Sequence, residues 1–209
     1  MKKLIKTLLK KLLPNSFGKS VSRISLDIEL KSQFKRLKPG VVLDVGSKHS
    51  PYKKYIPNTK YMRLDINKKS LPDICCDLHK IKWQSNYFDT VVATEVLEHL
   101  YNPQKAINEI YRILKPGGIC ILSTRFIFVY HPDPKDYYRF TWDSLKYLFR
   151  KFSTIEIQHH GNRIQVLWQF IGGGSIFGLP FRTILNPILG KIHFKKTRYP
   201  LGFIIYAKK

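Results

Sequence analysis

The chain has 209 residues, of which 44% are hydrophobic, so it is long enough for one large domain or two small ones with a substantial core. Its three cysteines, Cys75, Cys76 and Cys120, give neither an even disulfide framework nor a C-x-x-C metal spacing. The composition therefore excludes a disulfide-rich secreted scaffold and a zinc ribbon, and we expect buried, reduced thiols in a cytosolic protein. No segment reaches the roughly 18 uninterrupted apolar residues of a membrane span.

The charge is strongly basic, with 37 Lys and Arg against 14 Asp and Glu and a net charge of +23. This excess favours an anionic partner. Positive charge is concentrated at the two ends, because residues 1–38 carry a net charge of +9 and residues 182–209 carry +7. The alternative is a general lysine bias of the source proteome, which implies no partner.

Residues 1–13 have the pattern of a short amphipathic helix, since lysines interrupt the apolar run that a secretory signal requires. At 100° per residue, leucine and isoleucine side chains fall on one half of the helical wheel and lysines on the other, and Pro14 ends the helix. The pattern is typical of a helix that lies in an anionic membrane interface. Two other interpretations are a helix packed on the protein's own core and a helix that contacts RNA.

Further along the chain, the sequence predicts alternating helices and strands. Helices are expected at residues 19–36, 104–114 and 142–152, where Lys115–Gly118 end the second and Thr141 caps the third. Strands are expected at residues 41–45, 61–66, 73–76, 88–94, 119–123, 155–158 and 201–207. This alternation favours a mostly parallel sheet covered on both faces. We predict an N-terminal helical extension over residues 1–38 and one α/β domain over residues 39–209.

An apolar insertion over residues 166–200 precedes the last predicted strand. Within residues 166–181 only Gln169 and Ser175 are polar, and Gly172–Gly174 disfavour a continuous helix. The run is too short to span a bilayer. It could cover a substrate pocket, dip into lipid or form core beneath a long loop.

Polar residues follow the first four predicted strands, where a doubly wound sheet binds its ligands. Asp44 and Gly46 end the first strand; the glycine lets a ligand approach the backbone, and the carboxylate can order the loop or accept from a ligand cation. Asp65 ends the second strand, 21 residues after Asp44, a spacing typical of a carboxylate that accepts from ribose hydroxyls. Asp77 is placed to accept from an adenine amine, and Glu95 follows the fourth strand. Taken singly, the last three also fit a solvated turn, an N-cap and a helix-start carboxylate.

The joint pattern resembles the class I S-adenosylmethionine-dependent methyltransferases, and in particular the small type-11 methyltransferase group. The resemblance rests on VLDVG, LD, D, FDTVVATEVLEHL and EIYRILKPGGICILS within residues 41–123, and extends more weakly through HPDPKDYYRFT at residues 131–141 to the last strand. It implies a Rossmann-like doubly wound sheet of seven strands, with the last strand antiparallel between the fifth and sixth. It also implies S-adenosyl-L-methionine as the cofactor, bound over the ends of strands one to four.

The resemblance carries a set of cofactor contacts onto this chain by position. The predicted residues are Asp44 and Gly46 at the methionine end, Asp65 at the ribose, Asp77 and Leu78 at the adenine, and their neighbours Ser47, Ile66 and Glu95. One departure is visible, because the family's D-x-G-x-G-x-G turn reads DVGSKHS over residues 44–50 and lacks two of the three glycines.

Methyl transfer from a sulfonium is an in-line displacement, so the protein supplies mainly alignment and a dry site, and no metal is implied. An acceptor hydroxyl or amine that loses a proton needs a base within about 3 Å. The candidates are Glu95, His99 and His131, of which we predict His131 and Glu95 to be catalytic. His131 also opens the segment expected on the acceptor side, where Tyr138 and Arg139 would orient the substrate. A purely structural role is the alternative for each histidine.

The sequence thus predicts a cytoplasmic S-adenosylmethionine-dependent methyltransferase, held at the inner face of a membrane by residues 1–13, with residues 166–189 as a second candidate for the membrane contact. The expected acceptor is a small-molecule or lipid-linked substrate, such as an envelope glycan or a lipid. One alternative is an RNA methyltransferase that exploits the positive charge, although no RNA-binding module or N-P-P-Y-type motif is recognisable. Another is a protein with the methyltransferase fold that has lost catalysis and acts as a binding partner.

Overall fold

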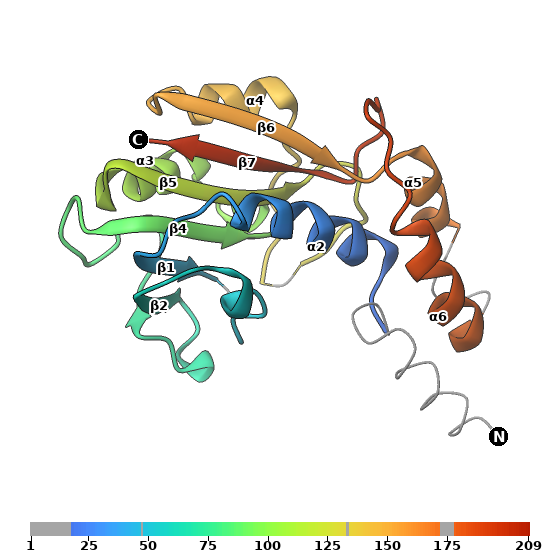
Figure 1. The fold of residues 1–209 in the computed structure, drawn as a ribbon, viewed down its shortest axis with the longest axis horizontal. Coiled ribbons are helices and arrows are strands. Elements are labelled where there is room, and N and C mark those ends of the chain that lie inside the picture. Colours follow the sequence, from blue (N-terminus) through green and yellow to red (C-terminus); the bar gives the residue numbers. More distant parts are fainter. Residues whose placement is uncertain (1–17, 47, 133, 172–177) are drawn as a thin grey trace. The chain divides into compact units, whose positions relative to one another are not determined.

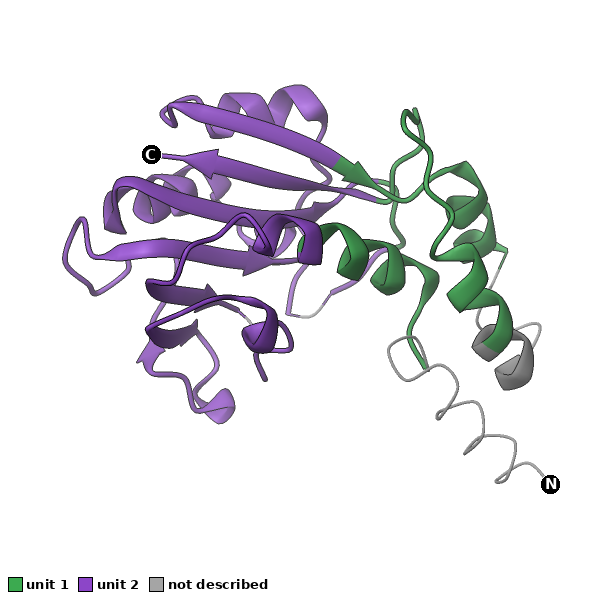
Figure 2. Ribbon diagram, in the orientation of Figure 1, with its two compact units in different colours: residues 1–30, 127–129, 159–201 green, residues 31–126, 130–158, 202–209 purple. Residues whose placement is uncertain are grey.

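A computed structural model describes residues 18–46, 48–132, 134–171 and 178–209 (Figure 1). The helix predicted over residues 1–13, the candidate residue Ser47 and the glycines at 172–174 lie outside the described residues. The chain divides into two compact units, which Figure 2 distinguishes by colour. We call residues 31–126, 130–158 and 202–209 the sheet unit, and residues 1–30, 127–129 and 159–201 the helical unit.

The sheet unit is built on seven strands in the order β3-β2-β1-β4-β5-β7-β6 (Figure 1). These strands are β1 (Val41–Val45), β2 (Lys60–Asp65), β3 (Ile74–Cys75), β4 (Phe88–Thr94), β5 (Leu114–Arg125), β6 (Thr154–His160, whose last two residues belong to the helical unit) and β7 (Gly202–Lys208). The first five pair in parallel, and β7 runs antiparallel to β5. The predicted seven-stranded, doubly wound sheet with an antiparallel last strand is therefore confirmed.

The central strands form where short runs of β-branched and other apolar residues occur. In β1 and β4, consecutive residues are buried together, as Val42 with Leu43 and Val91 with Val92 show. Because successive side chains of a strand point to opposite faces, both faces of the sheet must be covered at these positions. The alternation of helix and strand in the sequence had predicted this double cover.

The helices are α2 (Val21–Phe34), α3 (Pro103–Ile113), α4 (Trp142–Leu148), α5 (Arg163–Phe170) and α6 (Gly178–Leu189), with 3-10 turns η1 (Lys53–Tyr55), η2 (Lys68–Ser70) and η3 (Leu97–His99). Thr141 caps α4 as predicted, since its Oγ1 accepts from the Ser144 amide at 3.2 Å and its own amide donates to the Ser144 hydroxyl at 2.9 Å. The helix ends four residues before the predicted Phe152, because Phe149 and Phe152 both turn into the core.

Two strands differ from the prediction. β5 begins at Leu114, not at Ile119, so Lys115–Gly118 lie within a strand that follows α3 directly. Its pairing with β4 shifts register between Phe88 and Thr90, and Gly117 adopts a φ of +78°, so the glycines accommodate an irregular stretch of strand. β3 keeps only two residues of the predicted 73–76. It is an edge strand, and the expectation of buried thiols is wrong for Cys75, which is exposed there.

The helical unit contains α5, α6 and the first ten residues of α2. The predicted apolar insertion therefore holds two helices, one on each side of residues 172–177. Among the described residues, no helix combines the length and the apolar character needed to cross a membrane. The predicted domain boundary after residue 38 remains a prediction.

Candidate active site

The parallel strands bring their carboxyl ends to one edge of the sheet. Val45 of β1 pairs with Leu64 of β2 on one side and with Ala93 of β4 on the other. The next residue, Gly46, donates its amide to the Leu64 carbonyl at 2.7 Å. Asp65 directly follows Leu64, so it ends β2 beside the end of β1. The structure thus gathers the predicted strand-end residues along a single edge, with Asp77 two residues beyond β3.

The turn after β1 has the backbone conformation of a glycine-rich loop, although its composition departs from the family. Gly46 has a φ of +64°, and a Cβ at this position would lie 2.7 Å from Cγ2 of Val96. Lys48 and Ser50, which stand where the family has its other glycines, have φ angles of +49° and +50°. These residues adopt the left-handed region at a conformational cost. The loss of two glycines has therefore not removed the left-handed backbone at either position.

Asp44 is buried at the base of this turn and accepts a hydrogen bond from the Tyr61 hydroxyl at 2.5 Å. Burial raises the pKa of Tyr61, and the neighbouring Asp44 carboxylate raises it further. A phenol that stays protonated is a permanent donor, so Tyr61 anchors the carboxylate that ends β1. The roles predicted for Asp44, ordering the loop or accepting from a ligand cation, stay predictions.

Asp65 and Ile66 present a carboxylate beside an exposed apolar side chain. Oδ1 of Asp65 accepts from the Asn67 amide at 2.9 Å, and its Oδ2 has no hydrogen-bond partner among the described residues. Ile66 is 66% exposed, so its aliphatic side chain is available to a ligand at this edge. A nucleoside offers hydroxyl donors and an apolar ring face, so these two residues fit the predicted ribose end of the cofactor.

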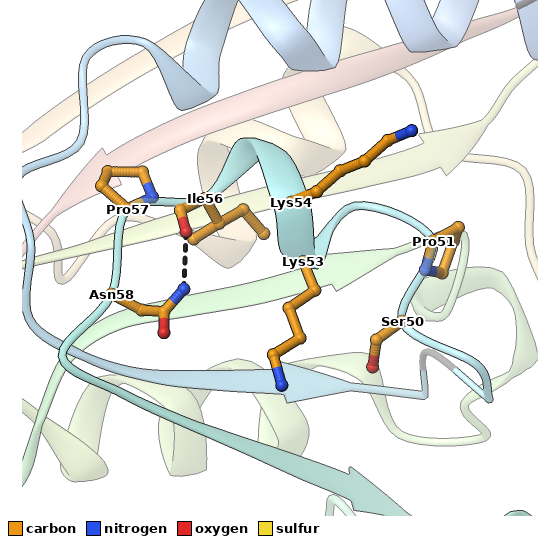
Figure 3. Close-up of a pocket in the computed structure, with 7 residues that line it drawn as sticks. All are labelled: Ser50, Pro51, Lys53, Lys54, Ile56, Pro57 and Asn58. Carbon is orange, nitrogen blue, oxygen red and sulfur yellow. Dashed lines mark hydrogen bonds between the residues drawn. The ribbon is translucent and has the colours of Figure 1, made fainter.

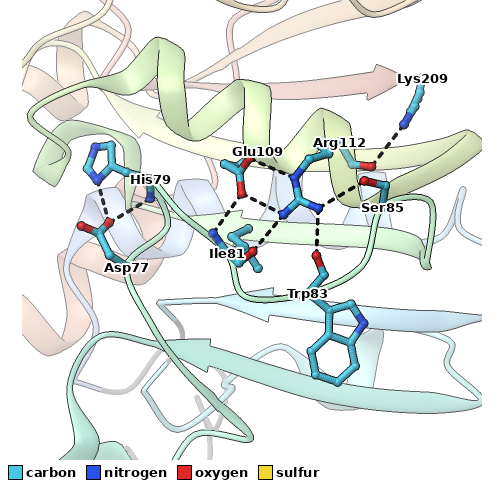
Figure 4. Close-up of polar contacts among 8 residues, drawn as sticks. All are labelled: Asp77, His79, Ile81, Trp83, Ser85, Glu109, Arg112 and Lys209. Carbon is cyan, nitrogen blue, oxygen red and sulfur yellow. Dashed lines mark hydrogen bonds and ion pairs between the residues drawn. The ribbon is translucent and has the colours of Figure 1, made fainter.

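Asp77 is held by His79, as Figure 4 shows. Its Oδ1 accepts from the His79 amide at 2.8 Å and lies 2.6 Å from His79 Nδ1. Burial opposes ionisation, but the hydrogen bonds from His79 outweigh it and lower the pKa of Asp77. The Asn102 amide donates to His79 Nε2 at 3.3 Å, so the network assigns the ring proton to Nδ1. Leu78, predicted beside the adenine, is buried.

An ion pair on α3 fixes the segment that follows Asp77 (Figure 4). The Arg112 guanidinium donates to the Ile81 carbonyl at 2.9 Å and to the Trp83 carbonyl at 2.8 Å. Glu109 accepts from the Ile81 amide at 2.9 Å and pairs with Arg112, which lowers the pKa of Glu109 and raises that of Arg112. This pair of Glu109 and Arg112 was not predicted from the sequence. The i, i+3 spacing of the two charges on one helix is the feature that could have indicated it.

Glu95 follows β4 in a strained and buried position. Its φ is +56°, its amide donates to the Ser123 carbonyl at 3.0 Å, and its Oε1 accepts from the Ser123 hydroxyl at 3.0 Å. Its Oε2 forms an ion pair with Arg125, and both side chains are less than a tenth exposed. The carboxylate is thus engaged on both oxygens, and its predicted catalytic and cofactor-binding roles remain predictions. Arg125 was not among the residues predicted from the sequence. The feature that could have indicated it is a single basic residue at the end of an apolar strand.

Glu98 lies one turn further along, in η3, and is only 1% exposed. Its Oε2 accepts from the Thr124 hydroxyl at 2.8 Å, while Oε1 has no hydrogen-bond partner among the described residues. Burial raises the pKa of Glu98 to about 8, and the negative charge of Glu95 contributes. A second carboxyl therefore stands behind the strand ends in its protonated form at neutral pH.

We expect Glu98 to make folding weaker as pH rises. In the folded chain Glu98 keeps its proton up to about pH 8, whereas an unfolded glutamate releases it near pH 4.5. The contribution of Glu98 to the free energy of unfolding is therefore complete below pH 4.5 and is lost as the pH rises through 8. Each pKa unit corresponds to about 1.4 kcal/mol. Urea unfolding at a series of pH values should show a shallower decline in Glu98→Gln than in the parent. The exposed Glu156→Gln serves as control; equal slopes in Glu98→Gln and the parent would contradict this assignment.

The predicted acceptor-side segment, residues 131–141, contacts η3 in the part that the structure describes. The His131 ring centroid lies 5.8 Å from that of His99, and the His131 amide donates to Asp136 Oδ2 at 2.7 Å. Arg139 pairs with the same Asp136 carboxylate, which raises the pKa of Arg139, with smaller contributions from Glu98 and Glu95. The structure therefore brings His131 and Arg139 together as predicted, close to the charged groups behind β4.

The other predicted orienting residue, Tyr138, is also fixed. Its hydroxyl donates to the Tyr101 carbonyl at 3.1 Å, and its amide and that of Tyr137 both donate to the Glu98 carbonyl. The backbone of η3 thus holds the acceptor-side segment. Asp136, which holds His131 and Arg139 in this segment, was not predicted from the sequence, although the D-Y-Y-R spacing could have indicated a pair of Asp136 with Arg139.

A surface hollow of about 720 Å³ lies beside the turn after β1 (Figure 3). Its lining residues are Ser50, Pro51, Lys53, Lys54, Ile56, Pro57 and Asn58. None of the predicted cofactor or acceptor residues is among them, but Ser50 belongs to the turn after β1, so the hollow adjoins the strand-end site.

Comparison with known proteins agrees with this geometry. Residues 43–122 match the family described as a methyltransferase domain. The chain is similar to the ubiquinone/menaquinone biosynthesis C-methyltransferase UbiE of Burkholderia cenocepacia, at 33% identity over 82 residues, and to that of Burkholderia mallei at 32%. These alignments cover 39% of this chain and 33% of each relative, so the chain spans about a third of the length of the curated relatives it matches.

Solved structures share the fold at low sequence identity. A SAM-dependent methyltransferase from Archaeoglobus fulgidus aligns with a TM-score of 0.57 at 16% identity, covering 100% of this chain and 95% of that one. Phosphoethanolamine N-methyltransferase 2 of Haemonchus contortus, in complex with S-adenosyl-L-methionine, aligns at 0.57 and 15%, covering 97% and 56%. The [4+2]-cyclase SpnF aligns at 0.57 and 18%, covering 88% and 80%. At such identities the likeness shows the fold alone.

The domain match and the shared fold make this part of the chain similar to the S-adenosylmethionine-dependent methyltransferases. Residues 43–122 match the methyltransferase-domain family, which confirms the resemblance seen in the sequence. The predicted enzyme class and its cofactor, S-adenosyl-L-methionine, are confirmed at the level of this domain. The roles of the individual residues stay predictions.

Proposed function

We propose that the whole protein transfers a methyl group from S-adenosyl-L-methionine to a lipid-linked or envelope glycan, or to a lipid, at the inner face of a membrane. The observation that carries the proposal is the strand-end edge. There a turn with three left-handed residues faces a carboxylate with an unengaged oxygen and an exposed isoleucine. Each feature has a counterpart in the cofactor, namely its charged end, its ribose and its apolar ring.

The described residues offer the cofactor a bare backbone at the turn after β1 and carboxylates at the ends of β2 and β3. At Gly46 a Cβ would collide with Val96, so the backbone alone forms that part of the turn. Asp65 would accept from the ribose hydroxyls and Asp77 from the adenine amine. When bound, the cofactor supplies a methyl group on a positively charged sulfur. The chain has to hold the acceptor in line with it and exclude water.

The acceptor side supports an amphipathic substrate. Tyr130, Tyr137 and Tyr138 are exposed on the segment that carries His131, and exposed tyrosines give flat apolar faces with a polar tip. His131 and His99 lie side by side there, and either can take a proton from an acceptor hydroxyl or amine. The UbiE relatives are named for ubiquinone and menaquinone biosynthesis, which also favours a lipid-linked acceptor. Residues 1–13 would hold the protein at the membrane.

Asp65→Ala tests the proposed cofactor site. Loss of ribose hydrogen bonds to a charged acceptor should weaken S-adenosyl-L-methionine binding by about 10- to 150-fold, as measured by titration calorimetry. Asp143→Ala removes an exposed carboxylate at the start of α4 and should bind like the parent. Equal affinities for Asp65→Ala and the parent would contradict the assignment of the ribose site.

The second candidate is a protein of this fold that does not transfer methyl groups. Two observations favour it: SpnF, which has a similar fold, is named as a cyclase, and the turn after β1 lacks two of the family's glycines. If the unmutated protein binds no cofactor, this candidate replaces the first. Labelled cofactor offered with a membrane extract and with total RNA separates the remaining alternatives. A labelled lipid or glycan supports the proposal, and labelled RNA alone overturns it.

A further inference from the structure

Helix α5 has an inverted distribution of polar and apolar side chains. Gln165 is fully buried at 0% exposure, whereas Leu167 is 59% exposed. Ile164, Leu167 and Ile171 follow one another at spacings of three and four residues, so they lie on one stripe, and Phe170 is exposed beside it. A helix that packs against its own protein core would bury this stripe.

Hydrogen bonds explain why the Gln165 side chain faces inward. The Gln165 amide donates to the Leu189 carbonyl at 2.7 Å and to the Ile192 carbonyl at 3.0 Å. These carbonyls lie at the end of α6 and just beyond it, where the helix leaves backbone acceptors unpaired. Gln165 therefore fixes the orientation of α5, and its leucine and isoleucine stripe must face outward.

Helix α6 repeats the arrangement. Asn186 is buried; its Oδ1 accepts from Trp168 Nε1 of α5 at 2.8 Å, and its Nδ2 donates to the Lys19 carbonyl at 2.9 Å. Ile184 and Ile188, four residues apart on the helix, are both about half exposed. The two helices are adjacent within the helical unit, as the Trp168 to Asn186 bond requires and Figure 1 shows. The unit thus joins its helices through polar side chains and exposes large aliphatic ones.

Basic residues predominate in the segments that adjoin these stripes. No Asp or Glu occurs after Glu156 in the sequence. The exposed basic residues next to the two helices in the sequence are Arg163, Lys191, Lys195, Lys196 and Arg198. The two acidic residues described in the helical unit, Asp27 and Glu29, are paired with Lys19 and His193. An occupant of this surface must therefore offer apolar groups and negative charge together.

We propose that the helical unit docks on an anionic lipid bilayer through the exposed stripes of α5 and α6, with the basic residues 191–198 near the headgroups. An anionic bilayer meets both requirements, since its acyl region takes aliphatic side chains and its headgroups take lysine and arginine. A second copy of the same face would bring like charges together. RNA would leave the aliphatic stripes unpaired.

This inference deepens the proposed function by supplying a membrane contact on described residues, and it rests on the proposed membrane location. It does not depend on methyl transfer, because vesicle binding and cofactor binding are measured separately. Absence of vesicle binding with intact cofactor binding contradicts the docking and the membrane location but leaves the proposed methyl transfer standing. A loss of cofactor binding with intact vesicle binding contradicts only the enzymatic proposal.

Vesicle co-sedimentation of the full chain tests the docking. We expect binding to phosphatidylglycerol mixed with phosphatidylcholine and little binding to phosphatidylcholine alone, with strong weakening by salt. Leu167→Gln with Ile171→Gln should weaken binding about tenfold or more, because two aliphatic side chains no longer enter the acyl region. Lys195→Gln with Lys196→Gln should weaken binding to the anionic vesicles. Tyr147→Gln is the matched control, since it removes a 65% exposed apolar side chain from α4 in the sheet unit.

Circular dichroism and cofactor affinity show whether each variant is folded; if the α5 variant is not, Ile184→Gln with Ile188→Gln replaces it. Leu8→Gln with Leu12→Gln separates the contribution of residues 1–13. Release by this variant alone overturns the proposal, as does unchanged binding of the α5 and α6 variants. Binding to RNA but not to vesicles also overturns it. So does a concentration-dependent dimer that the α5 variant abolishes, because the occupant would then be a second copy.

Discussion

Arg125→Met should lower the free energy of unfolding by about 3–5 kcal/mol, because it leaves the buried Glu95 carboxylate without its counter-charge. Glu95 and Arg125 are both less than a tenth exposed. The Ser123 hydroxyl is the other donor to the Glu95 side chain, and one neutral hydrogen bond does not replace a guanidinium. Urea unfolding of the parent and the variant measures the difference.

Arg36→Met is the matched control for this experiment. Arg36 forms a two-point ion pair with Glu156, at 2.6 and 2.8 Å, but both side chains are well exposed. An exposed pair of this kind is worth about 1 kcal/mol or less. Glu95→Gln combined with Arg125→Met should recover part of the lost stability, because the unpaired charge is then absent. If Arg125→Met costs no more than Arg36→Met, the buried ion pair does not hold the end of β4.

The strands and their order were accessible from the sequence for different reasons. β1 and β4 coincide with their predicted bounds because dense β-branched runs end at a glycine or a polar residue. The position of β7 between β5 and β6 came from the family resemblance, since no local pattern encodes which strands are neighbours. The early start of β5 was missed, because a Lys-Pro-Gly-Gly run favours a turn unless the β4 edge is there to pair with it.

The residues of the candidate site also differ in whether the local sequence could predict them. Residues just after the strands were predictable, because parallel strands place their carboxyl ends at one edge. The ion pair of Glu95 with Arg125 was not, since it depends on how the residues after β4 and β5 meet in space. The burial of Gln165 was hidden as well: the few polar residues of a largely apolar helix are expected on its outside, and the carbonyl partners of Gln165 lie at the end of another helix and just beyond it.

His131→Ala should reduce turnover by about 100- to 10,000-fold while leaving the affinity for S-adenosyl-L-methionine unchanged. His131 lies on the acceptor-side segment, beside His99, and the strand-end residues predicted to hold the cofactor lie elsewhere on the edge. Its side chain is exposed, so its removal should cost little folding stability. Transfer of a labelled methyl group to a membrane extract measures turnover, and calorimetry measures cofactor affinity.

Two comparisons make this result specific. His99→Ala shows which of the neighbouring histidines takes the proton, since a base acts from one ring and its neighbour should cost less. His159→Ala, in the last part of β6, removes a histidine that lies outside the predicted site and should leave turnover near that of the parent. Because the amide of His131, not its ring, donates to Asp136, the alanine variant keeps the backbone bond that holds the segment. Unchanged turnover in His131→Ala would therefore assign its ring no part in the reaction, and a large loss in His99→Ala alone would move the base to η3.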